Sequence, residues 1–583
     1  MTRRSTDRTP GDATGDATGR ADDAIGREAR AVYGDRGDAV ADALRALAAR
    51  FRASADHEPV PPARRMTEDD SILITYPGAI RRPDEAPLRT LGSWLRGPLA
   101  NTVSTVHLLP FYPWSSDDGF AVKDYRAVAP QYGSWDDVHA LRNDHRLMVD
   151  AVVNHASAQG DWFDRFLRDE APYRDWFRTE APDADVAATV RPRTTPLLTP
   201  FETAAGRRWA WTTFGPDQVD LDYREPSLLL EIAGVLLAYV GHGAEVLRMD
   251  AVTYLWKELG TPSVHHPKTH GLLRLMRAVL EEAAPWVVLL TETNVPHAEN
   301  VSYFGDGRDE AQMVYNFALP PLMLHTVASG DATVLRDWAG TLGTPSDQTW
   351  FLNFLASHDG IGVRPVEALL PRSAVDALVD RTRKQGGGLG RKRNADGTES
   401  TYELNVNYFD ALCDPDHEER LDRQVDRFAA AHAVMAALPG VPSVYLHSLL
   451  GSRGSPELAA RHGVPRAVNR AQLDSETLSR ELADPRGRRA RVLAAIRALL
   501  RARRGRPAFH PSAPSTVLDA PPGVFAVRRG VEERTVTCIQ ELAGRDATVR
   551  VQRGGRELLS GRQIEPGTVP VRPYQVLWID DTG

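Results

Sequence analysis

Eight short apolar segments alternate with stretches of helical periodicity over most of this chain. Apolar runs of four to nine residues, separated by helices, are typical of parallel strands that are buried on both faces. The segments cover residues 72–76, 105–111, 147–154, 245–250, 287–292, 312–317, 349–357 and 441–447. Eight β/α units predict an α/β fold, a closed (β/α)8 TIM barrel whose functional site lies at the carboxyl ends of the strands.

Two long interruptions divide the predicted barrel, which consists of residues 71–155 and 223–504. Residues 156–222, rich in aromatics and proline, form a predicted inserted domain after the third strand. Residues 360–412 form a predicted inserted loop region after the seventh strand. Segments of this length without the β/α rhythm are usually functional or mobile in a compact fold.

The two ends of the chain show different patterns. Residues 1–35 mix Thr, Asp, Gly and Arg without periodicity, which predicts a disordered extension. Residues 36–70 are predicted to be a helical extension, because Val40, Leu44 and Phe51 recur at helical spacing. Short alternating strands predict an antiparallel β domain over residues 505–583.

Composition excludes several classes of protein. The formal net charge of -8 argues against a general nucleic-acid binder. The two cysteines, Cys413 and Cys538, form no metal-binding or disulfide pattern. No apolar run approaches the roughly 20 residues of a membrane span. We therefore expect a cytoplasmic protein with small-molecule substrates and with no metal, cofactor, nucleic-acid partner or membrane partner.

Four of the apolar segments end in charged or polar side chains. These are Asp150, Asn154 and His155 on the third segment, Arg248 and Asp250 on the fourth, Glu292 on the fifth, and His358 and Asp359 on the seventh. The carboxyl ends of parallel strands meet at one edge, so these groups predict one site. Arg248 and Asp250 lie on the same face of their strand, where the cation can hold the acid ionised as a nucleophile. A structural ion pair is the alternative interpretation.

These residues resemble a known family in their order and setting. Asp150-xxx-Asn154-His155, Arg248-x-Asp250, Glu292 and His358-Asp359 are similar to the four motifs of the α-amylase clan, glycoside hydrolase family 13. Within the clan, residues 110–120, 217–220, 317–322, 358–363 and 438–445 resemble the sucrose phosphorylase group. Residues 248–257 and 291–300 are most similar to those of the glucosylglycerate phosphorylases. The resemblance covers the chain from about residue 70 to its end.

The resemblance implies a retaining transfer of glucose, with a role for each matching residue. Asp250 is the implied nucleophile, Glu292 the acid/base, and Asp359 the transition-state stabiliser. The implied glucose-binding residues are Asp117, Phe120, His155, Phe214, Gln218, Arg248, His358 and Arg470, with Asp117 and Arg470 as a charge pair at the far end of the sugar. The implied phosphate- and acceptor-binding residues are Arg191, Arg193, Tyr254, Asn294, Tyr402 and Glu403.

Departures from the sucrose-specific pattern indicate a different leaving group. Asn294 stands where a histidine is expected, and Tyr402-Glu403 replaces the family's Tyr-Gln pair. The second insertion is basic, which suits an acidic acceptor such as D-glycerate, although a solvated face is the alternative. Its cations are Arg381, Arg383, Lys384, Arg391, Lys392 and Arg393.

We therefore predict a phosphorylase that converts 2-O-α-D-glucosyl-D-glycerate and phosphate to α-D-glucose 1-phosphate and D-glycerate by double displacement. The alternatives are phosphorolysis of sucrose, sucrose 6′-phosphate or glucosylglycerol, an α-glucosidase, and a non-catalytic binding subunit. Homodimerisation is left open.

Overall fold

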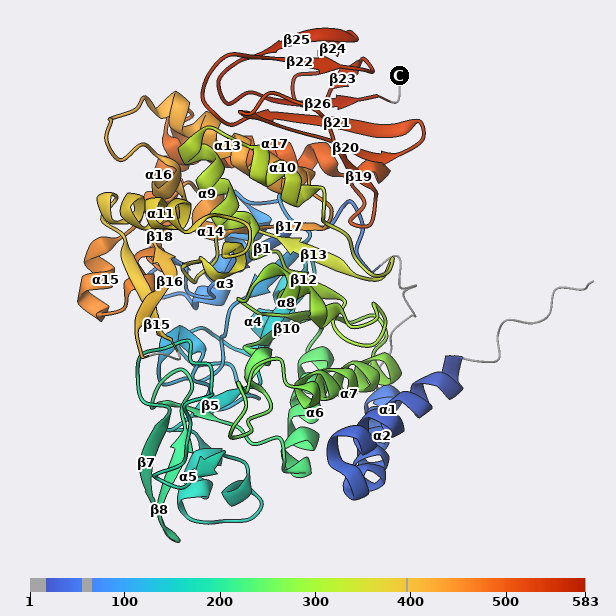
Figure 1. The fold of residues 1–583 in the computed structure, drawn as a ribbon, viewed down its shortest axis with the longest axis vertical. Coiled ribbons are helices and arrows are strands. Elements are labelled where there is room, and N and C mark those ends of the chain that lie inside the picture. Colours follow the sequence, from blue (N-terminus) through green and yellow to red (C-terminus); the bar gives the residue numbers. More distant parts are fainter. Residues whose placement is uncertain (1–16, 55–64, 395–396, 582–583) are drawn as a thin grey trace, which may run out of the picture.

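A closed barrel of eight parallel strands forms the centre of the fold (Figure 1). The computed structural model describes residues 17–54, 65–394 and 397–581. Around the barrel the strands follow the order β1-β17-β13-β12-β11-β10-β4-β3. Their bounds are β1 (Ile72–Thr75), β3 (Thr105–Leu108), β4 (Arg146–Val152), β10 (Ala244–Asp250), β11 (Val288–Thr291), β12 (Met313–Tyr315), β13 (Trp350–Asn353) and β17 (Val441–Tyr445). The predicted TIM barrel is confirmed.

Helices connect the strands along the chain. They are α3 (Pro87–Arg96), α4 (Trp135–Leu141), α6 (Pro226–Gly241), α7 (Pro267–Ala283), α8 (His297–Val301), α9 (Leu319–Ser329), α10 (Thr333–Ala339), α13 (Leu421–Ala437) and α17 (Arg488–Arg503). Several begin with proline. Proline is tolerated there because the N–H groups of the first turn have no hydrogen-bond partner within the helix, so the absence of one costs nothing. At α6 the side chain of Glu225 accepts a hydrogen bond from the Ser227 N–H and so caps the helix. None of the helices in the described ranges is both long and apolar enough to cross a bilayer.

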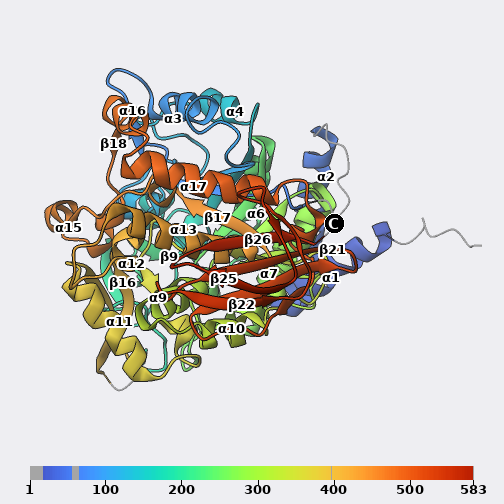
Figure 2. The ribbon, with the colours of Figure 1, turned by 90° about the horizontal axis from the view of Figure 1, so that it is seen from above.

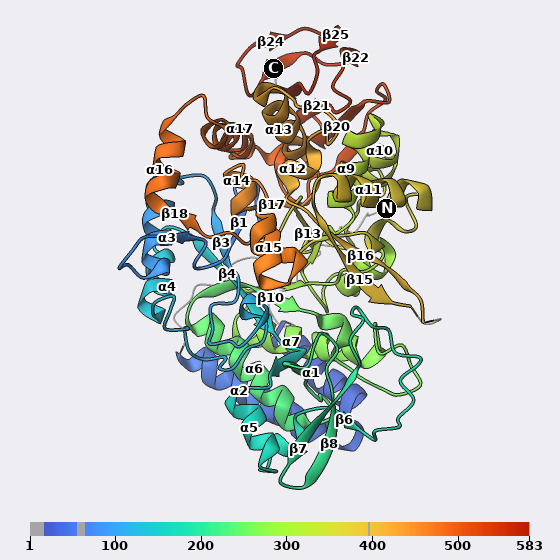
Figure 3. The same cartoon turned by 90° about the vertical axis from the view of Figure 1, so that its left-hand side faces the viewer.

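The N-terminal extension is a helical hairpin, which corrects the prediction of disorder up to residue 35. Helix α1 (Ala17–Tyr33) packs on α2 (Gly37–Ser54), and both pack on α7 (Figures 1 and 3). Ile25, Ala29 and Val32 are buried at helical spacing. The prediction failed because these few apolar residues lie among Gly, Asp and Arg. Residues 1–16 of the predicted disordered segment, and residues 55–64 of the helical extension, lie outside the described residues.

Gly271 on α7 lies directly beneath α1. A Cβ at Gly271 would approach Val32 Cγ2 to 2.7 Å, whereas a Cβ at Gly234 on α6 has no neighbour nearer than 3.6 Å. Replacing a helical glycine by alanine stabilises a helix by roughly 0.5–1 kcal/mol when there is room. We expect Gly234→Ala to raise the unfolding temperature. Gly271→Ala is expected to lower it by overpacking, at a cost of about 1–3 kcal/mol.

Calorimetry on the two alanine variants compares their effects. Limited proteolysis of the hairpin then shows whether α1 is the displaced element. A rise in unfolding temperature for both variants would contradict close packing of α1 on α7.

The segment between β4 and α6 lies over the carboxyl ends of the strands. It contains β5 (His155–Ser157) paired with β9 (Gln218–Asp220), helix α5 (Asp161–Leu167), and a sheet of β6 (Thr179–Glu180), β8 (Gly206–Trp211) and β7 (Leu198–Thr203). The segment after β13 contains α11 (Arg372–Lys384), α12 (Tyr408–Leu412) and a sheet of β14 (Ile361–Gly362), β16 (Glu399–Asn405) and β15 (Gly388–Arg393). The two segments touch at a backbone bridge between Arg191 and Arg393.

Antiparallel strands form the C-terminal domain beyond α13 and α17 (Figure 2). One sheet contains β19 (Ser515–Val517), β20 (Val524–Val531), β21 (Arg534–Glu541), β26 (Val576–Asp580), β23 (Gly555–Glu557) and β24 (Gln563–Ile564); a second contains β22 (Ala547–Val551) and β25 (Gly567–Val571). The domain has its own apolar cluster, which includes Val524, Ile539 and Val549. The predicted C-terminal antiparallel domain is confirmed.

Candidate active site

A buried ion-pair network at the carboxyl ends of β4 and β10 holds the first acids of the site. Asp150 lies opposite Arg248 in the register of the two strands, and the Arg248 guanidinium donates to it. Arg248 Nη1 also lies 2.8 Å from Asp250 Oδ1. His107 Nε2 is 2.7 Å from the other oxygen of Asp150. Although burial opposes ionisation, Arg248 and His107 lower the pKa of Asp150, so this acid keeps Arg248 charged beside Asp250.

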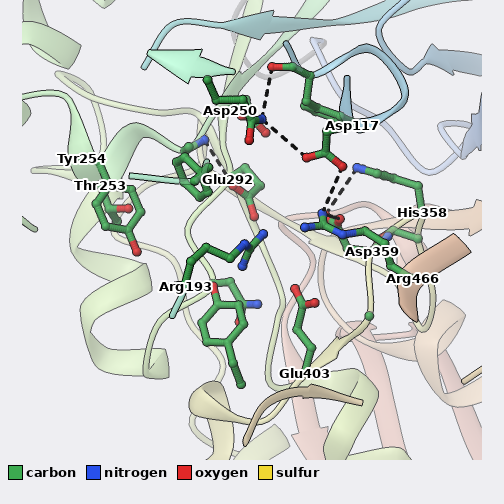
Figure 4. A pocket seen from close by; sticks show the side chains of 18 of the residues that line it. Asp117, Arg193, Asp250, Thr253, Tyr254, Glu292, His358, Asp359, Glu403 and Arg466 are labelled. Atoms are coloured by element: carbon green, nitrogen blue, oxygen red, sulfur yellow. Dashed lines mark hydrogen bonds and ion pairs between the residues drawn. The ribbon is translucent and has the colours of Figure 1, made fainter. Parts of the chain in front are cut away.

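Asp250 and Glu292 are carboxyls at the ends of the neighbouring strands β10 and β11, and both line the pocket (Figure 4). Asp250 is buried and Glu292 is partly buried. Burial raises the pKa of Asp250 and outweighs its ion pair with Arg248, and burial also raises the pKa of Glu292. Like charges in a buried site disfavour ionisation of both carboxyls, and Glu292 is one of the groups that raise the pKa of Asp250. The two acids differ in their partners, because Asp250 has the direct ion pair with Arg248, at 2.8 Å.

The backbone between these two acids is strained. Ala251 has φ 52° and ψ 33°, a left-handed conformation that costs a residue with a side chain roughly 1–2 kcal/mol. In this conformation the Ala251 N–H donates to Glu292 Oε2 at 3.2 Å. Strain of this kind is concentrated at functional sites, and here it fixes the acid next to Asp250.

A third acid, Asp359, lies among cations after β13. Arg466 Nη1 is 2.9 Å from Asp359 Oδ1, and His358 Nε2 is 3.3 Å from Asp359 Oδ2. Although burial alone would raise the pKa of Asp359, His358, Arg466 and Arg470 lower it well below its ordinary value. Burial lowers the pKa of His358 to about 3. Asp359 is therefore a fixed anion beside a neutral imidazole.

Polar and aromatic side chains enclose the same pocket on the side of Asp117. His155 Nε2 lies 2.9 Å from the carbonyl oxygen of Phe120, and Gln218 Nε2 lies 3.2 Å from the same ring nitrogen. The Phe120 ring stacks on His358 with 4.9 Å between centroids. Flat apolar faces beside fixed acids and imidazoles suit a sugar ring, which has apolar faces and hydroxyls at its edge.

The opposite wall combines residues of the two segments that interrupt the barrel with residues that follow β10 and β11. Arg193 lies over the rings of Phe214 and Tyr402, at 5.6 and 5.9 Å from their centroids. Tyr254, Asn294 and Glu403 complete this wall, and Figure 4 shows Arg193 and Glu403 on the side of the group away from Asp250. Burial raises the pKa of Glu403 despite the nearby Arg466 and Arg193. Through Arg193 this wall can bind an anion beside Asp250 and Glu292.

Comparison with known proteins identifies the family. Residues 102–360 match the α-amylase catalytic-domain family. A glucosylglycerate phosphorylase of Allomeiothermus silvanus is 44% identical over 554 residues, which cover 94% of this chain and 97% of that protein. The chain belongs to the glucosylglycerate phosphorylase family.

More distant relatives agree with this family assignment. A sucrose phosphorylase of Agrobacterium vitis is 31% identical over 76% of the chain and 88% of its own length. The crystal structure of sucrose 6F-phosphate phosphorylase from Thermoanaerobacter thermosaccharolyticum has a TM-score of 0.72 at 23% identity, covering 86% of this chain and 98% of that one. That likeness shows a shared fold.

Most of the site residues predicted from the sequence line one pocket in this member of the glucosylglycerate phosphorylase family. They are Asp117, Phe120, His155, Arg193, Phe214, Gln218, Asp250, Tyr254, Glu292, Asn294, His358, Asp359, Tyr402 and Glu403. Arg191, Arg248 and Arg470 are not among the lining residues. Arg248 lies behind Asp250 in its ion pairs, and Arg191 lies where the two inserted segments touch.

The charge pair expected between Asp117 and Arg470 is present, and Asp118 joins it as a second acid. Arg470 Nη1 is 2.7 Å from Asp118 and 3.5 Å from Asp117. Arg466, which the sequence analysis missed, lines the pocket and binds Asp359. Its position in the short 3-10 turn η8 (Pro465–Asn469), which the predicted residue Arg470 caps, was the available signal. Thr253, Val295 and Phe317 also line the pocket and carried no such signal.

The basic run of the second insertion does not line the pocket, so the argument that linked it to an acidic acceptor was wrong. Arg381 donates to backbone carbonyls of Ala411 and Cys413. Three further cations of the run form ion pairs with carboxylates: Arg383 with Asp380 at 3.0 Å, Lys384 with Asp416 at 2.9 Å, and Arg391 with Glu399 at 3.7 Å. These four cations are thus paired with groups in their own part of the chain, and the identity of the acceptor rests on other residues.

Proposed function

We propose that this chain is a retaining glycoside phosphorylase that converts 2-O-α-D-glucosyl-D-glycerate and phosphate to α-D-glucose 1-phosphate and D-glycerate. The observation that carries this proposal is the 44% identity to a glucosylglycerate phosphorylase over 94% of the chain. The pocket supports it with three carboxyls in three different environments. Homodimerisation and a cytoplasmic location stay predictions.

In the first step Asp250 attacks the anomeric carbon and forms a glucosyl ester. Glu292, in its protonated form, gives its proton to the glycosidic oxygen as the bond to D-glycerate breaks. In the second step Glu292 takes a proton from phosphate, whose oxygen bonds to the anomeric carbon while the ester bond to Asp250 breaks. Two inversions leave the α configuration unchanged.

The surrounding residues hold the substrates for these steps. Asp359 accepts hydrogen bonds from the glucose hydroxyls, and Arg466 donates hydrogen bonds to them. The fixed negative charge of Asp359 also stabilises the positive charge that develops on the ring. Arg193 binds phosphate, since guanidinium groups match its geometry and charge. Tyr402, beneath the Arg193 guanidinium, shields the glucosyl ester from water.

Phosphate release from α-glucose 1-phosphate tests the proposal directly. Purified protein is offered D-glycerate, fructose, fructose 6-phosphate or glycerol in parallel, and one reaction contains no acceptor. We expect release with D-glycerate at least tenfold faster than with any other acceptor. Preferred use of fructose, its phosphate or glycerol would overturn the acceptor, and equal release without acceptor would indicate a hydrolase.

A further inference from the structure

The carboxylate of a D-glycerate acceptor requires a cation near the acceptor wall, if the proposed function holds. Arg193 is the lining cation on that wall, and the mechanism uses it for phosphate. The basic run of the second insertion lies outside the pocket, as described above. Arg466, the other lining arginine, is paired with Asp359, so the carboxylate of the acceptor requires a further cation.

Arg364 lies next to the acceptor wall through the short strand β14. Gly362 of β14 pairs with Glu403 of β16, a residue that lines the pocket. On its other side Gly362 lies against Asn294, because a Cβ at this glycine would be 2.3 Å from Asn294 Oδ1. Arg364 begins the 3-10 turn two residues later. Its side chain therefore starts beside two residues of the wall.

Two buried polar atoms in this region have no hydrogen-bond partner within the described part of the chain. They are the Nε of Arg364, a donor, and the Oδ1 of Asn294, an acceptor. A buried group without a partner costs roughly 1–3 kcal/mol, and more for a charged group. A ligand that carries a carboxylate next to a hydroxyl would satisfy both, since the carboxylate accepts from the guanidinium and the hydroxyl donates to the amide oxygen.

The positive charge of Arg364 affects the pKa of a residue that lines the pocket. Burial raises the pKa of the Tyr254 hydroxyl to about 12, and Arg364, followed by Arg193, acts in the opposite direction. The charge of Arg364 therefore acts on Tyr254, which lines the pocket, although Arg364 is not itself among the lining residues.

We propose that Arg364 binds the carboxylate of the acceptor, with Asn294 accepting from its hydroxyl, so that Arg364 determines specificity for a 2-hydroxycarboxylate. Phosphate interacts with Arg193 instead. The two anions of the reaction thus have separate cations on one wall. Asn294 and Arg364 act together, because both adjoin Gly362.

The Arg364→Gln protein tests this assignment. The measurement is kcat/KM for D-glycerate relative to glycerol, its neutral analogue, with α-glucose 1-phosphate as donor. Loss of a charge-assisted hydrogen bond should lower this ratio about 30-fold or more. In the phosphorolysis direction, KM for glucosylglycerate should rise by a similar factor while KM for phosphate changes less than threefold. Arg364→Lys keeps the charge without the planar fork and should give an intermediate ratio.

Arg391→Gln is the matched control, since Arg391 is exposed on β15 and paired with Glu399; its acceptor ratio should equal that of the wild type. An unchanged ratio in Arg364→Gln and Arg364→Lys would overturn the assignment, as would an equal loss with both acceptors or a parallel rise in KM for phosphate. Failure of the proposed function is distinguishable, because the wild-type protein would then not prefer D-glycerate at all.

Discussion

Asp250→Asn protein is expected to lose about four orders of magnitude in turnover of glucosylglycerate, because an amide cannot form the glucosyl ester. The change keeps the shape of the side chain and removes only its charge. Arg248 remains paired with Asp150, so we expect the protein to fold. The measurement is the rate of α-glucose 1-phosphate formation, with calorimetric unfolding as the check on structure.

Chemical rescue separates a nucleophile from an acid that only orients the substrate. Asp250→Gly leaves room for azide, which should attack the anomeric carbon from the vacated side and give β-glucosyl azide. Asp161→Asn, which alters an exposed acid on α5, is the control and should behave as wild type. Turnover of Asp250→Asn within tenfold of the wild-type rate would show that another group attacks the sugar.

Glu292→Gln protein is expected to cleave glucosylglycerate about 10²–10⁴-fold more slowly, since general acid catalysis contributes this much. α-Glucosyl fluoride has a leaving group that needs no proton, so its reaction with Asp250 should slow far less. The comparison of the two donors in one variant distinguishes loss of an acid from loss of structure. Equal losses with both donors would argue against Glu292 as the acid.

The pH dependence gives a second check on Glu292. Burial raises its pKa above the ordinary value of a glutamate, which keeps the acid protonated at higher pH. For phosphorolysis, kcat/KM should fall as pH rises through this raised pKa, because the proton donor is lost. In Glu292→Gln this alkaline limb should disappear. A limb that persists unchanged in the variant would belong to another group.

The barrel was predictable because its signal is repeated eight times. Apolar strands such as β10 and β13 end in polar groups only where a site requires them, and Asp250 and Asp359 therefore stand out in the sequence. Most lining residues also belong to the strand ends or lie in short motifs next to them. Their roles as nucleophile, acid and stabiliser remain proposals that the variants above test.

The remaining features depend on contacts that no local pattern carries. Arg466 reaches Asp359 across 107 positions of the chain, and Arg364 adjoins the wall only through the pairing of β14 with β16. Helix α1 was missed because it needs α7 for its stability, as most short amphipathic helices need a partner. For the basic run of the second insertion, the sequence suggested a role in binding an acidic ligand. In the structure its paired cations contact neighbouring carboxylates and backbone carbonyls.

The backbone bridge between Arg191 and Arg393 joins two segments that the chain inserts some two hundred positions apart. Redesign of the acceptor by exchange of loops is therefore a two-part operation. A chimaera that receives only one of the two segments from a sucrose phosphorylase has one native and one foreign segment at this bridge. The backbone pairing between the two segments is then no longer native on both sides. Libraries that recombine both segments together preserve this junction, and we expect functional chimaeras to be concentrated among them.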